Sequence, residues 1–272
     1  GPGEILLPDV HQHAPAQAFF GGAQSGVFVA VMTAIETALW DLTGKVFGVP
    51  VYQLLGGKFR DKIRVYCDTA LYTSTNPTPQ DYAKAARGAV DRGYTAVKFD
   101  VDDARDPNKY DRFNWTANPM EIERMYNAIA AVRQEVGPNI DICVDMHGRY
   151  DAVTGLKMAK MYEDLNLMFL EEPIPADNPE VYKSITTQTS TPICTGENIY
   201  LAYGFTRLLS ESAIDIIMPD IQKAGGLGEA QRIANLANLY YVPFAPHMVA
   251  SFLGAMASCV VCASVPNFMF MD

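Results

Sequence analysis

The sequence predicts an α/β barrel in which eight strands alternate with seven helices, a modified TIM barrel of the (β/α)7β type. Three observations predict this fold class. Short apolar or β-branched segments alternate along the chain with segments that carry apolar residues at helical spacing. Several strand segments are apolar almost throughout, which is typical of parallel strands buried on both faces. The chain of 272 residues also has the length of a barrel that folds as one domain.

The individual elements follow from these patterns in chain order. A first helix is predicted at 27–46, ahead of the barrel. The strands are predicted at 63–69, 95–101, 141–146, 167–172, 192–197, 215–220, 242–247 and 267–272. The helices between them are predicted at 79–92, 119–136, 152–164, 179–188, 201–212, 227–239 and 250–263. The chain therefore divides into an irregular segment at 1–26 and a barrel domain at 27–272.

The balance of charges limits the partners that the protein can have. Its 31 acidic and 21 basic residues give a net charge of −10, which disfavours nucleic acid and anionic membranes as partners. The five cysteines have no framework spacing, so we expect reduced thiols and a cytoplasmic protein. Cys259 and Cys262 form a C-x-x-C pair inside an apolar segment, and we interpret them as helix packing rather than as a redox or metal site. We expect neither a signal peptide nor a membrane span.

One predicted loop, at 102–118, is unusually long for a compact domain. It is polar and aromatic, and two interpretations remain open. Its residues Tyr110 and Trp115 could cover a site at the mouth of the barrel, or the loop is a surface excursion that packs on its own aromatic side chains.

Polar residues gather at the predicted carboxyl ends of the strands, where parallel barrels carry their active sites. They are Lys98, Asp100, Asp145, His147, Glu171, Glu172, Glu197, Asp220, His247 and Asp272. Asp145, Glu171 and Glu197 end three successive strands and are spaced 26 residues apart. Three converging carboxylates would repel each other unless a cation neutralised them, so the spacing predicts a Mg²⁺ site. The alternative is three separate solvated carboxylates.

His147 and His247 are two of only four histidines, and each ends a strand. Beside a metal site, such a pair suits the roles of general acid and general base. Asp220 ends the strand before that of His247, so it could bond one ring nitrogen and orient the ring. The glycine-rich segment that starts at Lys223 is either a phosphate site at a helix start or, as we favour, a tight turn.

These groups suit the removal of a carbon-bound proton beside a carboxylate. The reaction creates an enediolate, whose negative oxygens a divalent cation stabilises. If the second histidine protonates a departing hydroxyl, the result is loss of water. If it returns a proton to carbon, the result is racemisation, and these alternatives remain open on the residues alone.

Longer motifs resemble a known family. They are AIETALWDLTGKVFGVPVYQLLGG at 34–57, VDMHGRYD at 144–151, LEEP at 170–173, TGEN at 195–198, MPDIQKAGG at 218–226 and APH at 245–247. With these motifs the chain resembles the enolase superfamily, specifically the group of mandelate racemase and muconate lactonizing enzymes. The resemblance implies that Asp145, Glu171 and Glu197 bind Mg²⁺, and that Asp220 and His247 form an Asp–His pair with His247 as the base.

The third-strand motif refines the expected activity. Asp-x-His-Gly-Arg, at 145–149, resembles sugar-acid dehydratases of the galactonate and gluconate kind, which implies that His147 is the acid. Racemases of the family often carry Lys-x-Lys on the second strand, whereas this chain has Lys98-Phe99-Asp100. Asp272 stands where the family usually has a glutamate that bonds the enediolate. We expect Lys98, Asp100, Arg149 and Trp115 to contact the substrate.

The resemblance thus implies a Mg²⁺-dependent acid-sugar dehydratase that yields a 2-keto-3-deoxy acid from a small acid sugar, in a homo-oligomer. The alternatives are a racemase, an epimerase or a cycloisomerase of the same superfamily, and a non-catalytic barrel. Relatives carry an N-terminal α+β capping domain, and nothing of that kind is evident before Val27. We therefore expect a barrel without its usual cap, as a piece of a longer protein rather than a naturally capless enzyme.

Overall fold

The computed structural model describes residues 24–69, 71, 76–103, 109, 111, 113–249 and 251–272. Most of the predicted irregular segment at 1–26, and Tyr110 of the long loop, lie outside the described residues. The chain forms two compact units. We call Val65–Thr195 with Glu211–Ile216 the central unit, and Gly1–Arg64, Gly196–Ser210 and Ile217–Asp272 the terminal unit.

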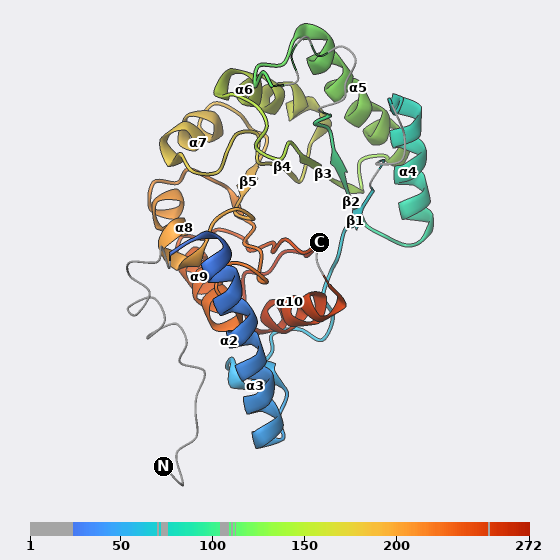
Figure 1. Ribbon diagram of the computed structural model, residues 1–272. Helices are drawn as coiled ribbons and strands as arrows, with labels where there is room; N and C mark the ends of the chain where they lie inside the picture. The colour runs from blue at the N-terminus through green and yellow to red at the C-terminus, as the bar shows by residue number, and fades with distance from the viewer. Residues whose placement is uncertain are drawn as a thin grey trace. The chain divides into compact units, whose positions relative to one another are not determined.

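The central unit is built on parallel strands that pair in chain order. They are β1 (Cys67–Asp68), β2 (Ala96–Asp100), β3 (Asp141–Asp145), β4 (Phe169–Glu171) and β5 (Ile193–Thr195). Four α-helices alternate with them, namely α4 (Pro79–Asp91), α5 (Pro119–Val136), α6 (Ala152–Met161) and α7 (Pro179–Thr186), with a 3₁₀ turn η2 (Tyr162–Leu165) after α6. Figure 1 shows these helices in an arc outside the strands. The strand β6 (Ile216–Ile217) runs from this unit into the terminal unit.

Burial on both faces of the strands explains their composition. Ala96 and Val97 are successive residues of β2, so their side chains lie on opposite faces of the strand, and both are fully buried. Ile142 and Val144 on β3 and Leu170 on β4 are fully buried as well. The prediction of a parallel sheet covered on both faces is therefore confirmed for this unit.

Two helix starts follow the signals read from the sequence. Thr78 and Asn118 precede α4 and α5, and each forms a capping box with the acidic side chain three residues on, Asp81 or Glu121. Proline occupies the first turn of both helices, where its missing N–H leaves no hydrogen bond unmade. These local signals fix where both helices start.

The terminal unit contains the helices α2 (Gly26–Phe47), α3 (Val51–Leu54), α8 (Leu201–Ser210), α9 (Leu227–Leu239) and α10 (Phe252–Ser264). Parallel bridges join Ile217 to Phe244 and Phe244 to Phe268. The N–H of Met271 donates to the carbonyl of Arg64 over 3.1 Å. Parallel pairing thus continues from β6 through both of the last predicted strands to the segment that enters β1.

The predicted strands at 242–247 and 267–272 are present as these single bridges rather than as ladders. Pro243 and Pro246 lack the N–H groups that a ladder needs, which explains the interruption of the first segment. Pro219 shortens β6 in the same way. In chain order, the eight parallel segments and the helices α4 to α10 still follow the predicted (β/α)7β sequence.

The helix α2 is long and apolar enough, by length and composition, to cross a membrane, which the sequence analysis did not anticipate. One such helix is weak evidence for a span. The helix buries Val29, Met32, Thr33 and Glu36 within the terminal unit, and Glu36 forms hydrogen bonds to α9. The window of this helix that is apolar enough to span a membrane is 28% buried.

Candidate active site

The carboxyl ends of β2, β3 and β4 bring three acidic residues to one edge of the central unit. The strand register pairs Asp100 with Asp145 and Asp145 with Glu171. Because side chains paired across parallel strands lie on the same face, these carboxylates are neighbours. Glu172 follows with left-handed backbone, and its carboxylate instead accepts a hydrogen bond from the Thr195 hydroxyl over 3.0 Å. The sequence therefore predicted correctly that Asp145 and Glu171 lie together.

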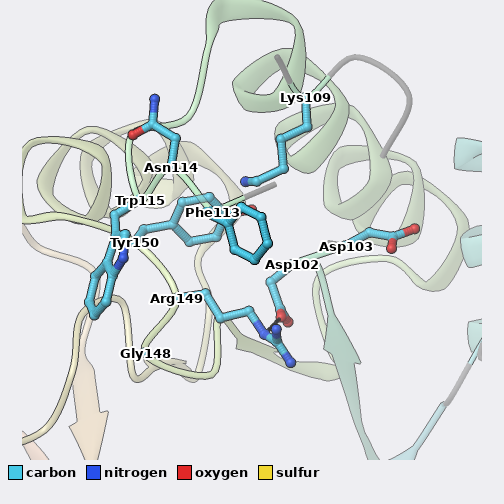
Figure 2. A pocket seen from close by; sticks show the side chains of 9 residues that line it. All are labelled: Asp102, Asp103, Lys109, Phe113, Asn114, Trp115, Gly148, Arg149 and Tyr150. Atoms are coloured by element: carbon cyan, nitrogen blue, oxygen red, sulfur yellow. Dashed lines mark ion pairs between the residues drawn. The ribbon is translucent and has the colours of Figure 1, made fainter. Parts of the chain in front are cut away.

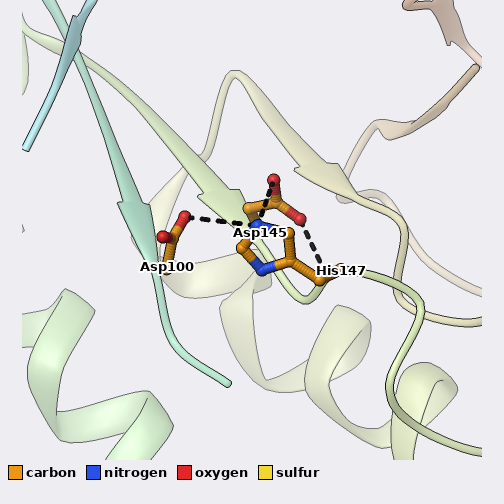
Figure 3. Close-up of side chains that lie close together, drawn as sticks. All are labelled: Asp100, Asp145 and His147. Atoms are coloured by element: carbon orange, nitrogen blue, oxygen red, sulfur yellow. Dashed lines mark hydrogen bonds and ion pairs between the residues drawn. The ribbon is translucent and has the colours of Figure 1, made fainter. Parts of the chain in front are cut away.

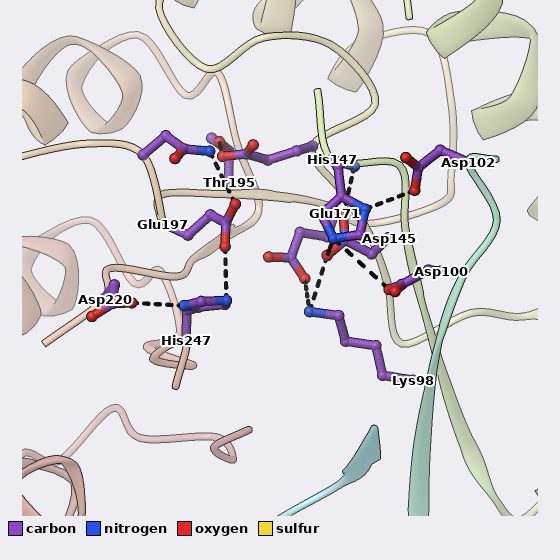
Figure 4. Close-up of polar contacts among 12 residues, drawn as sticks. Lys98, Asp100, Asp102, Asp145, His147, Glu171, Thr195, Glu197, Asp220 and His247 are labelled. Atoms are coloured by element: carbon purple, nitrogen blue, oxygen red, sulfur yellow. Dashed lines mark hydrogen bonds and ion pairs between the residues drawn. The ribbon is translucent and has the colours of Figure 1, made fainter. Parts of the chain in front are cut away.

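Lys98 supplies the positive charge between two of these carboxylates. Its Nζ atom lies 3.1 Å from Oδ2 of Asp145 and 2.7 Å from Oε2 of Glu171 (Figure 4). The three side chains are at most 4% exposed. Buried charges are tolerated only when they are paired, so this lysine is part of the support of the acidic edge. Its ammonium has three N–H donors, so these two contacts are compatible with its predicted contact with a substrate.

His147 lies two residues beyond β3 and faces the same carboxylates. Its backbone is left-handed, with φ of 48°, and its N–H donates to Oδ1 of Asp145 over 2.7 Å. A non-glycine residue adopts this conformation only when its surroundings enforce it. Nε2 of the ring lies 3.6 Å from Oδ2 of Asp145 and 4.0 Å from Oδ1 of Asp100 (Figure 3).

Asp102 is a site residue that the sequence analysis missed. Its Oδ1 atom lies 2.7 Å from Nδ1 of His147, and its other oxygen bonds Nε of Arg149. The Asp102 side chain is 4% exposed. Its position two residues past β2 matches that of His147 past β3, and this repeated offset is the signal that could have revealed it.

Electrostatics favour a charged His147 ring. Burial opposes the charged form, but the hydrogen bond to Asp102 and the charges of three nearby carboxylates outweigh burial and raise the pKa of His147 to about 10. The ring thus carries a proton at neutral pH. Possible metal-ligand atoms of Asp100, Asp145 and His147 all lie within 4.8 Å of one another.

A cavity of about 300 Å³ adjoins Asp102 in the central unit (Figure 2). Its lining includes the aromatic side chains Phe113, Trp115 and Tyr150 and the charged Arg149 and Lys109. Two of the predicted substrate contacts, Trp115 and Arg149, are therefore brought together. Because Asp102 bonds both His147 and the cavity residue Arg149, the cavity lies beside the histidine.

The terminal unit holds a second histidine between two carboxylates. Nδ1 of His247 lies 2.9 Å from Oδ2 of Asp220, and its Nε2 lies 2.7 Å from Oε2 of Glu197 (Figure 4). Asp220 and His247 are bridge partners on neighbouring parallel segments, as their positions in the sequence indicated. The N–H of Asp272 donates to the carbonyl of Pro246 over 3.5 Å, so the chain end lies beside the segment that carries His247.

The glycine-rich segment after Asp220 is a tight turn, and it has no room for a phosphate at the start of α9. The N–H groups of Leu227 and Gly228 at this start donate to the buried carboxylate of Glu36. An internal anion therefore takes the position that a phosphate would need.

The residues present fit a divalent cation. Asp145 and Glu171 offer buried carboxylate oxygens, the ligand type that Mg²⁺ prefers, and both already converge on one cation, the ammonium of Lys98. The carboxylates of Asp145 and Glu171 and the ammonium of Lys98 together carry a net charge of one negative unit, which a bound cation would offset. Glu197, the third predicted ligand, belongs to the terminal unit, where it contacts His247.

Parallel strands with buried carboxylates and two aspartate-held histidines at their carboxyl ends define an α/β-barrel enzyme class with acid–base chemistry. Residues 81–272 match the family model described as enolase C-terminal domain-like, and residues 11–56 match the mandelate racemase / muconate lactonizing enzyme N-terminal domain. The chain belongs to this enolase-superfamily family. The second match covers α2 and α3, so the capping domain that we expected to be lacking is present in part.

Similar proteins agree with this assignment. The chain is 38% identical to D-xylonate dehydratase of Haloferax volcanii, over 100% of this chain and 66% of that protein. It is 31% identical to D-galactonate dehydratase of Pectobacterium atrosepticum, over 96% of this chain and 64% of that protein. The chain thus spans about two thirds of the length of these curated relatives, or slightly less.

Solved structures share the fold. A mandelate racemase/muconate lactonizing enzyme-like protein from Rubrobacter xylanophilus is similar with a TM-score of 0.91 and 42% identity, over 98% of this chain and 72% of that chain. The 3,6-anhydro-D-galactonate cycloisomerase from Zobellia galactanivorans is similar with a TM-score of 0.81 and 30% identity, over 96% and 68%. The predicted (β/α)7β barrel fold is confirmed by these matches.

Proposed function

We propose that this chain is the catalytic part of a Mg²⁺-dependent acid-sugar dehydratase. It would remove the proton on the carbon beside the substrate carboxylate, expel the 3-hydroxyl as water and yield a 2-keto-3-deoxy acid. The observation that carries the proposal is the pair of histidines, each held at Nδ1 by an aspartate. The similarity to D-xylonate and D-galactonate dehydratases supports an acid sugar as the substrate.

His247 is the proposed base. The hydrogen bond from Nδ1 to Asp220 fixes the tautomer, so Nε2 is the nitrogen that accepts the substrate proton. In the structure Nε2 lies 2.7 Å from Glu197, and that carboxylate must release the ring before the ring can accept a proton. Asp220 then stabilises the charged imidazolium that forms.

His147 is the proposed acid. Its raised pKa, about 10, keeps the ring protonated at neutral pH, as a proton donor requires. Asp102 holds Nδ1, so Nε2 is the nitrogen that donates a proton to the departing hydroxyl. The C–O bond breaks as the electrons from the lost C–H bond form the enol, and the products are water and the enol of the keto acid.

Asp145, Glu171 and Glu197 are the proposed ligands of Mg²⁺. When bound, the cation would neutralise these carboxylates and stabilise the negative oxygens that develop on the substrate. Asp272 is proposed to bond one of those oxygens. Lys98 balances charge at the ligands, and Arg149 and Trp115 in the cavity of the central unit are proposed to bind the hydroxylated end of the substrate.

Direct assay tests this function. The purified chain with Mg²⁺ is incubated with D-xylonate, D-galactonate and D-gluconate, and the 2-keto-3-deoxy acid is measured. We expect product with at least one substrate, and none from the His247→Asn or Asp220→Asn variants. Absence of product with every substrate from a folded, Mg²⁺-binding chain would contradict the proposal.

A cycloisomerase is the second candidate, because the Zobellia galactanivorans enzyme shares the fold at 30% identity. Both reactions begin with the same proton transfer, so the product formed from an aldonate in deuterated water separates them, rather than the exchange itself. A cycloisomerase incorporates deuterium and opens an anhydro ring without releasing a linear 2-keto-3-deoxy acid from the aldonates. A non-catalytic barrel predicts neither exchange nor product, and unchanged properties after substitution of both histidines.

A further inference from the structure

The helix α2 reaches the segment that carries Asp220. Thr33 and Glu36 lie one turn apart on its buried side, with 2% and 0% exposure. The hydroxyl of Thr33 donates to the carbonyl of Val29 over 2.8 Å and accepts the N–H of Gly225 over 3.0 Å. All these residues belong to the terminal unit.

Glu36 binds the start of α9, a few residues further along the segment that carries Asp220, with both of its carboxylate oxygens. Oε2 accepts the N–H of Leu227 over 2.8 Å, and Oε1 accepts the N–H of Gly228 over 2.9 Å. The indole N–H of Trp40 also donates to Oε1, over 2.6 Å. Because a helix N-terminus carries a partial positive charge, the carboxylate is favoured there although it is buried.

The glycine at 226 makes this approach possible. Its φ is 101°, and a Cβ atom at this position would lie 2.1 Å from Oε2 of Glu36. A side chain would therefore displace the carboxylate from α9. This close approach explains a glycine that the sequence analysis could attribute only to a turn.

The other end of the segment is Asp220. The N–H groups of Lys223 and Ala224 donate to its carbonyl, and the N–H of Gln222 donates to Oδ1 over 2.8 Å. Its remaining oxygen, Oδ2, bonds Nδ1 of His247. A short turn with several internal hydrogen bonds thus connects Asp220, the partner of His247, to the backbone N–H groups of Gly225 and Leu227, which bind side chains of α2.

We infer that Glu36 and Thr33 are positioning residues for the Asp220–His247 pair. They hold the end of the turn that starts at Asp220, so they set the position of the carboxylate that orients His247. Their helix is part of the region that matches the N-terminal domain of the family, whereas the pair they position belongs to the barrel. The kinetic part of this inference rests on the proposed function, since it assumes that His247 is the base.

The test compares Glu36→Gln with a matched control. Glu121 is also a buried glutamate at a helix N-terminus, and it caps α5 in the central unit. Glu121→Gln therefore reports the loss of a buried capping charge, together with its ion pair to Lys109, in the central unit. At Thr33, Thr33→Val removes the hydroxyl at constant shape, and Thr33→Ser restores it.

Nitrogen-15 NMR of the histidine rings in the full chain is the first measurement, because it does not depend on turnover. We expect Glu36→Gln and Thr33→Val to shift and broaden the Nδ1–H signal of His247. Thr33→Ser and Glu121→Gln should leave that signal unchanged. Turnover of the aldonate is the second measurement, where we expect kcat to fall about tenfold or more in the first two variants with little change in KM.

A single result overturns the inference. If Glu36→Gln lowers the melting temperature as Glu121→Gln does, and leaves the His247 signal as in the unsubstituted chain, Glu36 only caps α9. A shifted signal in a chain without dehydratase activity would instead contradict the proposed function and support the positioning role. The two failures are thus distinguishable.

Discussion

Nδ1 of His147 lies 2.7 Å from Oδ1 of Asp102, in the same relation that Nδ1 of His247 has to Asp220 in the other unit. Each histidine therefore has one nitrogen fixed by an aspartate and the other facing a second carboxylate, Asp145 or Glu197. An enzyme that must both take and give a proton gains from two rings held in this way, since each ring has a defined reactive nitrogen.

The Asp102→Asn variant tests the first of these pairs. The amide keeps the shape but removes the charge and part of the hydrogen bond that stabilise the imidazolium, so the pKa of His147 should fall from about 10. We expect kcat to drop by roughly 10- to 100-fold. NMR titration and turnover assays measure the two effects. Asp103→Asn changes the neighbouring carboxylate of the same cavity and should have a much smaller effect on the pKa.

The pH dependence of stability follows from the same group. The folded-state pKa of His147, about 10, lies above the ordinary value of 6.5, so its stabilising contribution is fully present below pH 6.5 and is lost as the pH rises through 10. Denaturant unfolding in the presence of EDTA should show a decline in the free energy of unfolding over this window. His147→Asn should flatten that part of the curve, and an unchanged slope would contradict the assignment.

Lys98 is predicted to be essential for the stability of the metal-free protein. Replacement by methionine leaves Asp145 and Glu171 buried without their shared ammonium, which should cost about 3–5 kcal/mol. Urea unfolding in EDTA measures this loss. The exposed pair of Lys45 and Asp41 is the control, because Lys45→Met should cost less than about 1 kcal/mol. Equal losses would show that the buried lysine is not a counter-ion.

Metal addition provides a test of the proposed ligands. A cation that binds only the folded state stabilises the protein by roughly 2.7 kcal/mol when its concentration is about 100 times its Kd. Mg²⁺ should therefore raise the melting temperature. Glu171→Gln should remove most of this increase. The adjacent Glu172 bonds Thr195, so Glu172→Gln should lower the melting temperature yet keep the response to Mg²⁺. The same response in both variants would exclude Glu171 as a ligand.

Local signals allowed accurate prediction where they were strong. The helix α5 was predicted at its observed bounds, because Pro119 and the capping pair Asn118–Glu121 determine its start. The strand predicted at 242–247 was too long, because the apolar pattern does not reveal how Pro243 and Pro246 interrupt pairing. Asp145 and Glu171 were predicted to be neighbours because register follows from strand ends.

Contacts between distant segments account for what the sequence did not reveal. Asp102 was missed because its partner His147 is 45 residues away in the chain. The roles of Gly226 and Glu36 were hidden for the same reason. Lys98 was expected to face the substrate, and only the spacing of strands β2 to β4 shows that its ammonium lies between carboxylates.

The hydrogen bond from Leu227 to Glu36 joins residues 191 positions apart. During synthesis on the ribosome, the helix that carries the carboxylate is made 191 residues before the N–H group that it accepts. Closing so long a loop is slow compared with forming a helix, so the turn beside His247 should be among the last parts of the molecule to become ordered. The hydrogen-bonded pair of Asp220 and His247 would then reach its final geometry only late in folding.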